Sequence, residues 1–343
     1  MPPRSGKAVV TGAAGFVGSH LVDRLLGRCP GVSRGAVQQV IGVDCFTDYY
    51  ARAVKESNLA LAKRSPAFEF VEGDVLDVDW ATLLDGTEYV FHQAAQAGVR
   101  GSWGDTFGIY VRNNIQATQR LLEAARQAPK LKGLIFASSS SVYGDAESFP
   151  TPEDTTLLPI SPYGVTKLTC EQLCRVYHRS FGVPVVILRY FVAYGPRQRP
   201  DMAFHRFIQA MLQGKEISVY GDGEQTRDFT YVSDTAEANI LAMSSKAVGQ
   251  TFNVGGGSRV TVNQIIQLLE RIMGKRARVR YLPSQKGDAR HTFADISRAR
   301  QVLQYEPQVA IEEGLAKEVA WLESCLHTPP QSAQSAPPVQ EYT

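Results

Sequence analysis

The chain has 343 residues, of which 44% are hydrophobic and 20% charged, and its formal net charge is +2. This composition is typical of a globular protein with a sizeable buried core, and the balanced charge argues against a partner such as nucleic acid or a membrane surface. The five cysteines lack a C-x-x-C pair, so we expect free thiols in a reducing cytoplasm and no metal site. Cys170 and Cys174, one helical turn apart, are expected to pack in the core.

The first predicted unit is a strand, a tight turn and a helix within residues 9–26. Its turn carries Gly12-x-x-Gly15-x-x-Gly18. Gly12 permits a turn closed to side chains, Gly15 lets the backbone approach a pyrophosphate, and Gly18 lets the helix pack against the strand. The N–H groups of the helix N-terminus then face the phosphates. Because a glycine-rich turn alone is a weak signal, other residues must support this interpretation.

A second buried strand, QQVIGVDC, ends near Asp44. A carboxylate at this position accepts both hydroxyls of an adenosine ribose and repels a 2′-phosphate, which favours NAD over NADP; the alternative is an exposed loop carboxylate. A helix near 51–63 and strands ending at Asp74 and Ala95 are predicted next. We expect Asp74 to accept from an adenine amino group. His92 either lines the cofactor or is a structural histidine.

A long helix over residues 105–127 and the strand GLIFASSS continue this alternation. Strands alternating with helices predict an α/β fold with a Rossmann-type, doubly wound parallel sheet, which binds ligands at the carboxyl ends of its strands. The regular alternation of predicted strands and helices ends near Pro196. We therefore predict an NAD-binding domain over 1–195, a smaller α/β part over 196–327 that mainly binds substrate, and a disordered tail over 328–343. Amphipathic helices are expected in DTAEANILAMS, TVNQIIQLLERIM and IEEGLAKEVAWLESCL.

Candidate catalytic residues follow the strand that ends in the tetraserine 138–141. In SPYGVTK, Tyr163 and Lys167 are four residues apart and share one face of a helix. A neighbouring ammonium and a cationic nicotinamide ring stabilise a phenolate, which makes this tyrosine a usable base, and a strand-end serine can orient the substrate or relay its proton. Tyr-x-x-x-Lys alone is common by chance. Together with the glycine turn and the serines, in this order, it is far more specific.

With these motifs in place, the sequence resembles the extended short-chain dehydrogenase/reductases, within the NAD-dependent nucleotide-sugar epimerase and dehydratase family. The matching motifs are TGAAGFVGSH, HQAAQAGVR, SSSSVYG, YGVTK, LRYFVAYGPRQRPDMA and YGDGEQTRDFTYVSD, in family order. The resemblance implies NAD as cofactor and a nucleoside-diphosphate sugar bound between the two parts of the chain. It also implies that Ser139 is the catalytic serine, Tyr163 the base and Lys167 its partner.

The residues after Ser139 narrow the expected reaction. Dehydratases of this family resemble one another in having Asp-Glu there, and UDP-glucuronate decarboxylases have a Glu in the second place; this chain has Ser140 and Ser141. Two hydroxyls cannot supply the acid and base that an elimination needs. The sequence is instead similar to the bacterial UDP-glucuronate 4-epimerases, in which the serines and the arginine matching Arg199 lie near the sugar carboxylate.

Those enzymes usually carry Thr where this chain has Val192. That departure keeps open a 4-epimerase for neutral UDP-sugars, of the glucose or N-acetylhexosamine type. A UDP-glucuronate decarboxylase and a non-catalytic sensor of NAD or a UDP-sugar are further alternatives.

By this resemblance, the enzyme interconverts UDP-glucuronate and UDP-galacturonate. Tyr163 takes the 4-OH proton through or alongside Ser139, while the C4 hydride passes to NAD⁺ and returns to the other face of a 4-keto sugar, without decarboxylation. A homodimer formed through the helices near Asp105 and Ser161 is implied as well. The expected cofactor-binding residues are Gly12, Gly15, Phe16, Val17, Asp44, Asp74, Val75, Ala94, Ala95, Ser138, Tyr163, Lys167 and Tyr190. The expected substrate-binding residues are Arg100, Ser140, Ser141, Val192, Arg199, Arg227 and Arg290.

Overall fold

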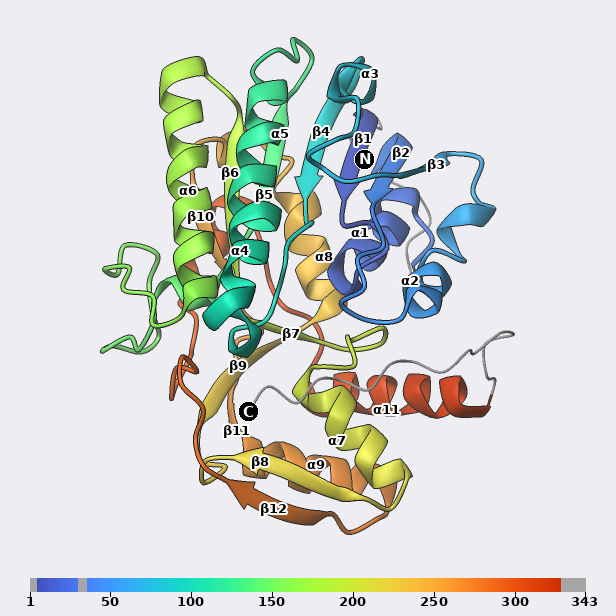
Figure 1. Cartoon of the computed structure of the whole chain (residues 1–343), viewed down its shortest axis with the longest axis vertical. Coiled ribbons are helices and arrows are strands. Elements are labelled where there is room, and N and C mark those ends of the chain that lie inside the picture. Colours follow the sequence, from blue (N-terminus) through green and yellow to red (C-terminus); the bar gives the residue numbers. More distant parts are fainter. Residues whose placement is uncertain (1–4, 30–35, 328–343) are drawn as a thin grey trace.

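The computed structural model describes residues 5–29 and 36–327, which contain a seven-stranded parallel sheet (Figure 1). The strand order is β10-β6-β5-β4-β1-β2-β3. The order reverses between β1 and β4, and a crevice for ligands forms at such a switch point. The predicted doubly wound α/β fold is confirmed. The strands are β1 (Ser5–Thr11), β2 (Val37–Asp44), β3 (Phe68–Glu72), β4 (Thr87–His92), β5 (Gly133–Ser139), β6 (Val185–Tyr190) and β10 (Thr251–Val254).

Helices cover both faces of this sheet, and the strand residues alternate between two cores. Ala8 and Val10 pack on one face with α1 (Phe16–Leu26), α8 (Val232–Leu241) and α10 (Ser297–Leu303). Val9 points to the other face, which is covered by α3 (Trp80–Leu84), α5 (Ala117–Ala125) and α6 (Pro162–Phe181). Cys170 and Cys174 are fully buried in that second core, so their predicted packing role is confirmed.

The smaller part of the molecule lies beyond the carboxyl ends of the large sheet (Figure 1). A three-stranded sheet of order β11-β9-β7 and a two-stranded sheet of β12 and β8 form it. A third core joins them, built around Phe204, Phe229 and Leu269. The strands are β7 (Val192–Tyr194), β8 (Glu216–Tyr220), β9 (Thr226–Tyr231), β11 (Arg259–Thr261) and β12 (Arg278–Leu282), and the helices are α7 (Ala203–Leu212), α9 (Val262–Met273) and α11 (Ile311–His327).

The amphipathic helices predicted late in the chain form, as α8, α9 and α11. Helix α9 begins with a capping box in which the Thr261 hydroxyl accepts from the Gln264 N–H and the Gln264 side chain accepts from the Thr261 N–H. The chain also returns to the large sheet after residue 196, because β10 pairs with β6 and α8 packs against α1. The later residues therefore contribute to both parts.

The helix expected over 105–127 is divided. It consists of a 3₁₀ turn η3 (Gly104–Thr106), α4 (Phe107–Tyr110), a π-helical turn η4 (Val111–Gln116) and α5. The π turn carries Asn114, whose Oδ1 accepts from the Gln96 N–H at 2.7 Å and whose Nδ2 donates to the Gln96 carbonyl at 3.1 Å. Such single π turns concentrate at functional sites, and this one holds the loop that follows β4.

Other predicted boundaries move by a few residues. β3 and β4 end at Glu72 and His92, before the expected Asp74 and Ala95, and the helix near 51–63 forms as α2 (Arg52–Asn58) and η1 (Ala62–Arg64). Further 3₁₀ turns are η2 (Arg100–Ser102), η5 (Ser140–Val142) and η6 (Ser245–Ala247). The tail predicted to be disordered lies outside the described residues.

Within residues 5–29 and 36–327, no helix is long and apolar enough to cross a lipid bilayer. No group of three or more His, Cys, Asp or Glu side chains in that part of the chain is placed to hold a metal ion.

Candidate active site

The glycine turn joins β1 to α1 at the switch point of the sheet. Gly12 has a positive φ of 67°, and a Cβ there would lie 2.8 Å from the Ala94 nitrogen. A Cβ on Gly18 would lie 2.0 Å from the Gly12 carbonyl oxygen. Both positions therefore require glycine. Gly15 is the N-cap of α1, so the N–H groups of the first turn, including those of Phe16 and Val17, lack intrahelical partners and suit a pyrophosphate.

Asp44 and Asp74 lie near this turn but differ in their partners. The Asp44 carboxylate accepts from the N–H groups of Ala14 at 3.1 Å and Phe46 at 2.9 Å. Burial raises its pKa, and these hydrogen bonds oppose the shift. Asp74 is instead ion-paired with Arg112 at 2.8 Å and accepts from the Leu76 N–H. A nucleotide amino group would therefore have to share the Asp74 carboxylate with an arginine, and the next residue, Val75, is buried.

Helix α6 carries the candidate base and its partner. The Ser161 hydroxyl caps the helix by accepting from the Gly164 N–H, and Pro162 starts the first turn. Gly164 permits close packing, because a Cβ there would lie 2.6 Å from the Ser141 carbonyl oxygen. The helix start, with Tyr163, is thus pressed against the serine turn after β5.

Lys167 is only 4% exposed, and its Nζ donates to the Ala137 carbonyl of β5 at 2.8 Å. Half-buried Tyr163 lies one helical turn away, and its ring packs edge-on against Tyr110. Tyr163, Lys167 and the serines are therefore gathered at the carboxyl end of β5, as the sequence motifs predicted for one site.

The four serines occupy different environments. The Ser138 hydroxyl donates to the buried Glu171 carboxylate at 2.6 Å, so its proton is not available to a cofactor. The Ser139 hydroxyl donates to the Ser141 hydroxyl and accepts from the Ser141 N–H, each at 3.1 Å. Ser139, Ser140 and Ser141 are half-buried, so a substrate can reach them.

The end of β4 and the residues after it lie beside the glycine turn, because the Thr11 hydroxyl contacts both His92 and Ala94. His92 is buried between the hydroxyls of Thr11 at 2.8 Å and Thr118 at 3.1 Å. Burial, with a smaller effect of Lys167, lowers its pKa to about 3, so the ring is neutral. Both ring nitrogens have protein partners. Of the two predicted roles, lining the cofactor or supporting the structure, these contacts favour the structural one. The Ala94 N–H, next to Ala95, donates to the Thr11 hydroxyl at 3.1 Å.

Tyr190 is the last residue of β6 and contacts Gln93, which follows β4. Its hydroxyl lies 2.9 Å from the Asn239 Oδ1 and 3.2 Å from the Gln93 Oε1, and burial raises its pKa. The ring, rather than the hydroxyl, is what it can offer to a cofactor.

Arg199, the candidate ligand for a sugar carboxylate, already holds a carboxylate of the protein. Its Nε and Nη2 donate to the two oxygens of Asp201 at 2.9 and 3.0 Å. The Tyr49 hydroxyl donates to Asp201 at 3.2 Å, and the Arg199 guanidinium lies over the Tyr49 ring. Sequence reasoning missed Asp201. Val192 begins β7, pairs with Phe229 and is half-buried in the third core.

Three arginines predicted to bind substrate gather between β9 and the segment before α10. Arg100 binds Asp288 at 2.9 Å and stacks on Tyr220, and exposed Arg290 binds Asp222 at 2.8 Å. Arg227 has no carboxylate within ion-pairing distance among the described residues and donates to the carbonyls of residues 226 and 290. Burial, and then the charge of Arg100, lowers its pKa. Arg227 is half-buried, and the more distant carboxylates of Asp288 and Asp145 offset the shift only in part. A half-buried guanidinium without a directly paired carboxylate suits a diphosphate.

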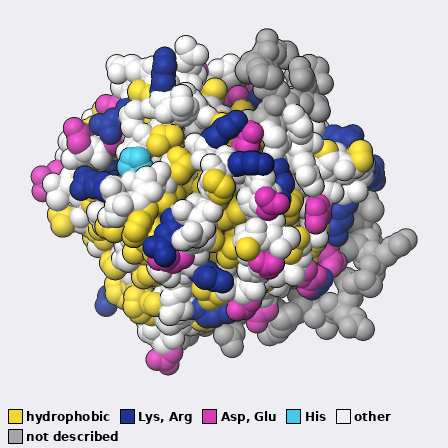
Figure 2. Space-filling view, turned by 90° about the horizontal axis from the view of Figure 1, so that it is seen from above, with side chains coloured by type: hydrophobic (Ala, Val, Ile, Leu, Met, Phe, Trp, Pro, Cys, Tyr) yellow, Lys and Arg dark blue, Asp and Glu magenta, His cyan; other side chains and the backbone are white. Residues whose placement is uncertain are grey.

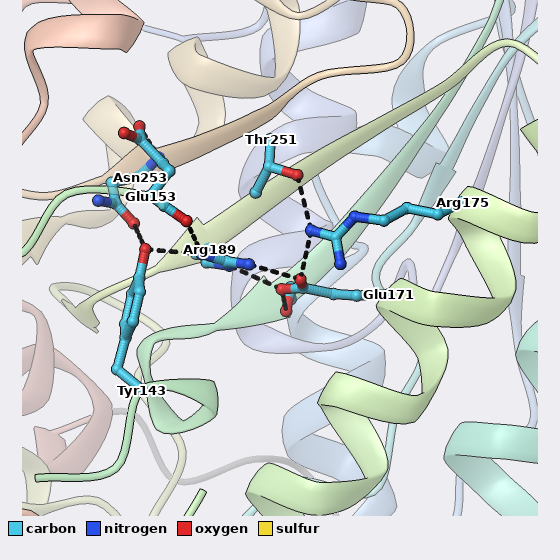
Figure 3. A network of polar contacts seen from close by, with 8 residues as sticks. Tyr143, Glu153, Glu171, Arg175, Arg189, Thr251 and Asn253 are labelled. Carbon is cyan, nitrogen blue, oxygen red and sulfur yellow. Dashed lines mark hydrogen bonds and ion pairs between the residues drawn. The ribbon is translucent and has the colours of Figure 1, made fainter. Parts of the chain in front are cut away.

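A buried polar cluster behind β5 was not predicted. We call Ser138, Tyr143, Glu171, Arg175 and Arg189 the Glu171 cluster. Figure 3 labels all of these residues except Ser138. Arg189 donates to both Glu171 oxygens, at 2.8 and 2.7 Å, and to the Tyr143 hydroxyl at 2.8 Å. Two signals were present in the sequence: Glu171 follows Lys167 by four residues, and Arg189 is a charge within the apolar run VVILRY.

Comparison with known proteins gives consistent matches. The model of the NAD dependent epimerase/dehydratase family matches residues 8–255. A UDP-glucuronate 4-epimerase of Thermodesulfobacterium geofontis is 39% identical over 322 residues, which cover 92% of this chain and 96% of that protein. A Bacillus subtilis protein named as an uncharacterized UDP-glucose epimerase is 46% identical over 320 residues, which cover 93% and 98%.

Among solved structures, similarity is high to the UDP-glucuronic acid 4-epimerase of Bacillus cereus in complex with UDP-glucuronic acid and NAD. The TM-score is 0.87 with 45% identity, covering 93% of this chain and 99% of that chain. The similarity therefore extends over both the sheet with the glycine turn and the smaller part with the arginines.

Proposed function

This chain belongs to the NAD dependent epimerase/dehydratase family, and from that premise we propose that it is an NAD-dependent UDP-glucuronate 4-epimerase. The observation that carries the proposal is the packing of the Tyr163 helix onto the serine turn through Gly164, with Ser140 and Ser141 where other reactions of the family need carboxylates. The relatives named as UDP-glucuronate 4-epimerases support the same activity.

The glycine turn suits NAD because side chains are excluded at Gly12 and Gly18 and the first N–H groups of α1 are free for a pyrophosphate. Asp44 accepts two backbone hydrogen bonds and has lone pairs left for ribose hydroxyls. When bound, NAD⁺ supplies the acceptor for the C4 hydride and its return to the opposite face of the sugar. We assign the cofactor site to this turn, Asp44 and the residues that follow β4.

The chain's own residues then move the proton. Tyr163 removes the 4-OH proton, with Ser139 orienting that hydroxyl or relaying its proton, and Lys167 stabilises the phenolate by its charge. Arg227, which makes no direct ion pair among the described residues and donates only to carbonyls, binds the diphosphate, helped by Arg100 and Arg290. These arginines fix the nucleotide while the sugar turns between the two hydride transfers.

The carboxylate must be held still, because a 4-keto uronic acid loses CO₂ when the C5–carboxyl bond lines up with the carbonyl π system. We propose that Ser140, Ser141 and Arg199 hold it in another orientation. Arg199 uses Nε and Nη2 on Asp201, so the sugar carboxylate takes the Nη1 side of the fork or displaces Asp201.

Replacing Arg199 by Ala is expected to weaken UDP-glucuronate binding about 10- to 100-fold relative to UDP-glucose, because a hydrogen bond to a charged group is lost. Isothermal titration with both nucleotides measures the ratio. In Arg199→Ala the Asp201 carboxylate loses its partner and would repel the sugar carboxylate. The double variant R199A/D201A removes this repulsion and so measures the loss of the cation alone. Arg206→Ala removes an exposed arginine of α7 and is the control. An unchanged ratio in both Arg199 variants would refute the carboxylate role.

A second candidate is a 4-epimerase for neutral UDP-sugars. Val192 favours it, since a valine at the start of β7 offers no hydroxyl to a carboxylate, and so does the name of the Bacillus subtilis relative. NMR of the purified protein with UDP-glucuronate, UDP-glucose and UDP-N-acetylglucosamine decides. Formation of the 4-epimer of the acidic sugar supports our proposal, whereas turnover of neutral sugars alone supports the second candidate. Formation of a UDP-pentose and CO₂ indicates a decarboxylase. Binding of NAD without turnover of any UDP-sugar indicates a sensor.

We further propose a cytoplasmic homodimer. All five cysteines are free, as expected in a reducing compartment. α5 and α6 stand side by side in front of the sheet (Figure 1), and apolar side chains gather on that side of the molecule (Figure 2). The large exposed apolar residues on α4 and α6 are Phe107, Ile109, Val165, Val176 and Phe181. Two such helices from each subunit pack isologously into a four-helix arrangement.

Changing Val176, which is 54% exposed, to Asp is expected to convert the dimer to a monomer, because the buried carboxylate would lack a partner in a two-fold interface. Light scattering coupled to size exclusion measures the mass. Leu326→Asp places the same charge at a residue of α11 that is 48% exposed and should leave the dimer intact. A dimeric Val176→Asp protein would exclude this interface.

A further inference from the structure

Helix α6 presents four polar residues at four-residue spacing: Tyr163, Lys167, Glu171 and Arg175. The first two are the proposed base and its partner. The last two belong to the Glu171 cluster, which Figure 3 shows between α6 and the neighbouring strands. The stripe that carries the catalytic pair therefore continues to Glu171, whose buried ion pair with Arg189 of β6 the proposed mechanism does not use.

Two side chains of this stripe hold consecutive residues of β5. The Lys167 Nζ donates to the Ala137 carbonyl at 2.8 Å, and the Ser138 hydroxyl donates to the Glu171 carboxylate at 2.6 Å. The next residue of β5 is Ser139. The register between the serine strand and the tyrosine helix is thus set by two hydrogen bonds one helical turn apart.

Arg189 holds Glu171 in place from β6. It is the cross-strand neighbour of Ser138, and it makes two hydrogen bonds to Glu171 and one each to the Tyr143 hydroxyl and the Glu153 carbonyl. Burial raises the pKa of Glu171, but the hydrogen bonds and charge of Arg189 outweigh it and keep that pKa below its ordinary value. An ionised Glu171 can only accept, so the Ser138 hydroxyl must donate to it.

We propose that the Glu171 cluster positions the catalytic serine: Arg189 fixes Glu171, Glu171 holds Ser138, and Ser139 is thereby held at a constant place relative to Tyr163. This role rests on the proposed 4-epimerase function. Glu171 is 0% exposed and Arg189 1% exposed, so neither touches a substrate. The cluster acts on the rate of the chemical step, where small displacements are costly, and not on substrate binding.

The first test compares three variants with the UDP-sugar that the wild-type protein turns over. Ser138→Ala is expected to lower kcat about tenfold and to leave KM within about twofold, whereas Ser138→Thr, which keeps the hydroxyl, restores kcat. Thr251→Val is the matched control: it also removes one hydroxyl at the edge of the network, the acceptor of Arg175 at 3.2 Å, but on β10. It should lower the melting temperature as Ser138→Ala does, without lowering kcat.

A second variant avoids an unpaired buried charge. E171L/R189M replaces the ion pair by apolar side chains, an exchange that folds tolerate. It should lower kcat as Ser138→Ala does, and adding Ser138→Ala to it should lower kcat no further, because the acceptor is already gone.

The outcomes separate this role from the proposed function. Turnover by the wild-type protein together with an unchanged kcat in Ser138→Ala, an equal loss in Thr251→Val, or full additivity in the triple variant would each overturn the positioning role alone. Failure of the wild-type protein to turn over any UDP-sugar would overturn the proposed function, and this role with it.

Discussion

Replacing Tyr163 by Phe is expected to lower kcat about 10³-fold, within the range that general base catalysis contributes, while the fold and NAD binding persist. The substitution removes one oxygen atom. Among the described residues the Tyr163 hydroxyl has no hydrogen-bond partner, and the ring keeps its edge contact with Tyr110. The loss must therefore come from the missing base and not from altered packing.

Steady-state rates with UDP-glucuronate, measured beside melting temperatures, test this expectation. Tyr89→Phe is a matched control, because its hydroxyl donates to the Met243 carbonyl at 3.2 Å and belongs to no part of the proposed site. It should retain kcat. A Tyr163→Phe protein with more than about a tenth of the wild-type rate would assign the base to another residue.

Much of the fold was predictable because it depends on local patterns. The alternation of apolar runs with helical spacing indicated the doubly wound sheet, and Gly12 and Gly18 were interpretable because each meets backbone atoms that tolerate no Cβ. The placement of Tyr163 and Lys167 one turn apart on α6 followed from their spacing in the sequence. These inferences need only neighbours in the sequence and the geometry of one element.

Contacts between distant elements were not predictable in the same way. The return of β10 to the large sheet depends on a pairing with β6 that no local pattern encodes. The π turn at η4 adds a residue to a helical turn without changing the apolar character of the segment. Sequence periodicity therefore predicted one continuous helix. The structure instead has a π turn, whose Asn114 side chain hydrogen-bonds to the loop after β4.

The ion pairs of the candidate substrate site could not be predicted from the sequence either, because they also join separate segments of the chain. Arg199 and Arg227 both stood out as cations, but only the structure shows that Arg199 is paired with Asp201 whereas Arg227 has no such partner among the described residues. Their expected roles differ for that reason. A guanidinium that already holds a carboxylate can exchange or share it with an acidic sugar. A guanidinium with no directly bound carboxylate favours a diphosphate, which brings more charge.

Replacing Lys167 by Met is expected to lower kcat about 10²- to 10³-fold without unfolding the protein. Lys167 is 4% exposed and its Nζ lies over the Phe136 ring, while the nearest carboxylate along α6, Glu171, is held by Arg189. The ammonium charge is therefore not neutralised by that carboxylate and remains available to stabilise a phenolate at Tyr163. A methionine of similar length fills the same space.

The stability of the Lys167→Met protein decides between a catalytic and a structural lysine. Replacing a buried ammonium by a methionine removes a desolvation cost and one hydrogen bond to the Ala137 carbonyl, so the free energy of unfolding should change little. A loss of kcat that clearly exceeds the roughly tenfold loss expected of Ser138→Ala, at an unchanged unfolding free energy, assigns the charge to catalysis. A loss of kcat that appears only with a comparable loss of stability would instead make Lys167 a support of β5, and Tyr163 would need another source of activation.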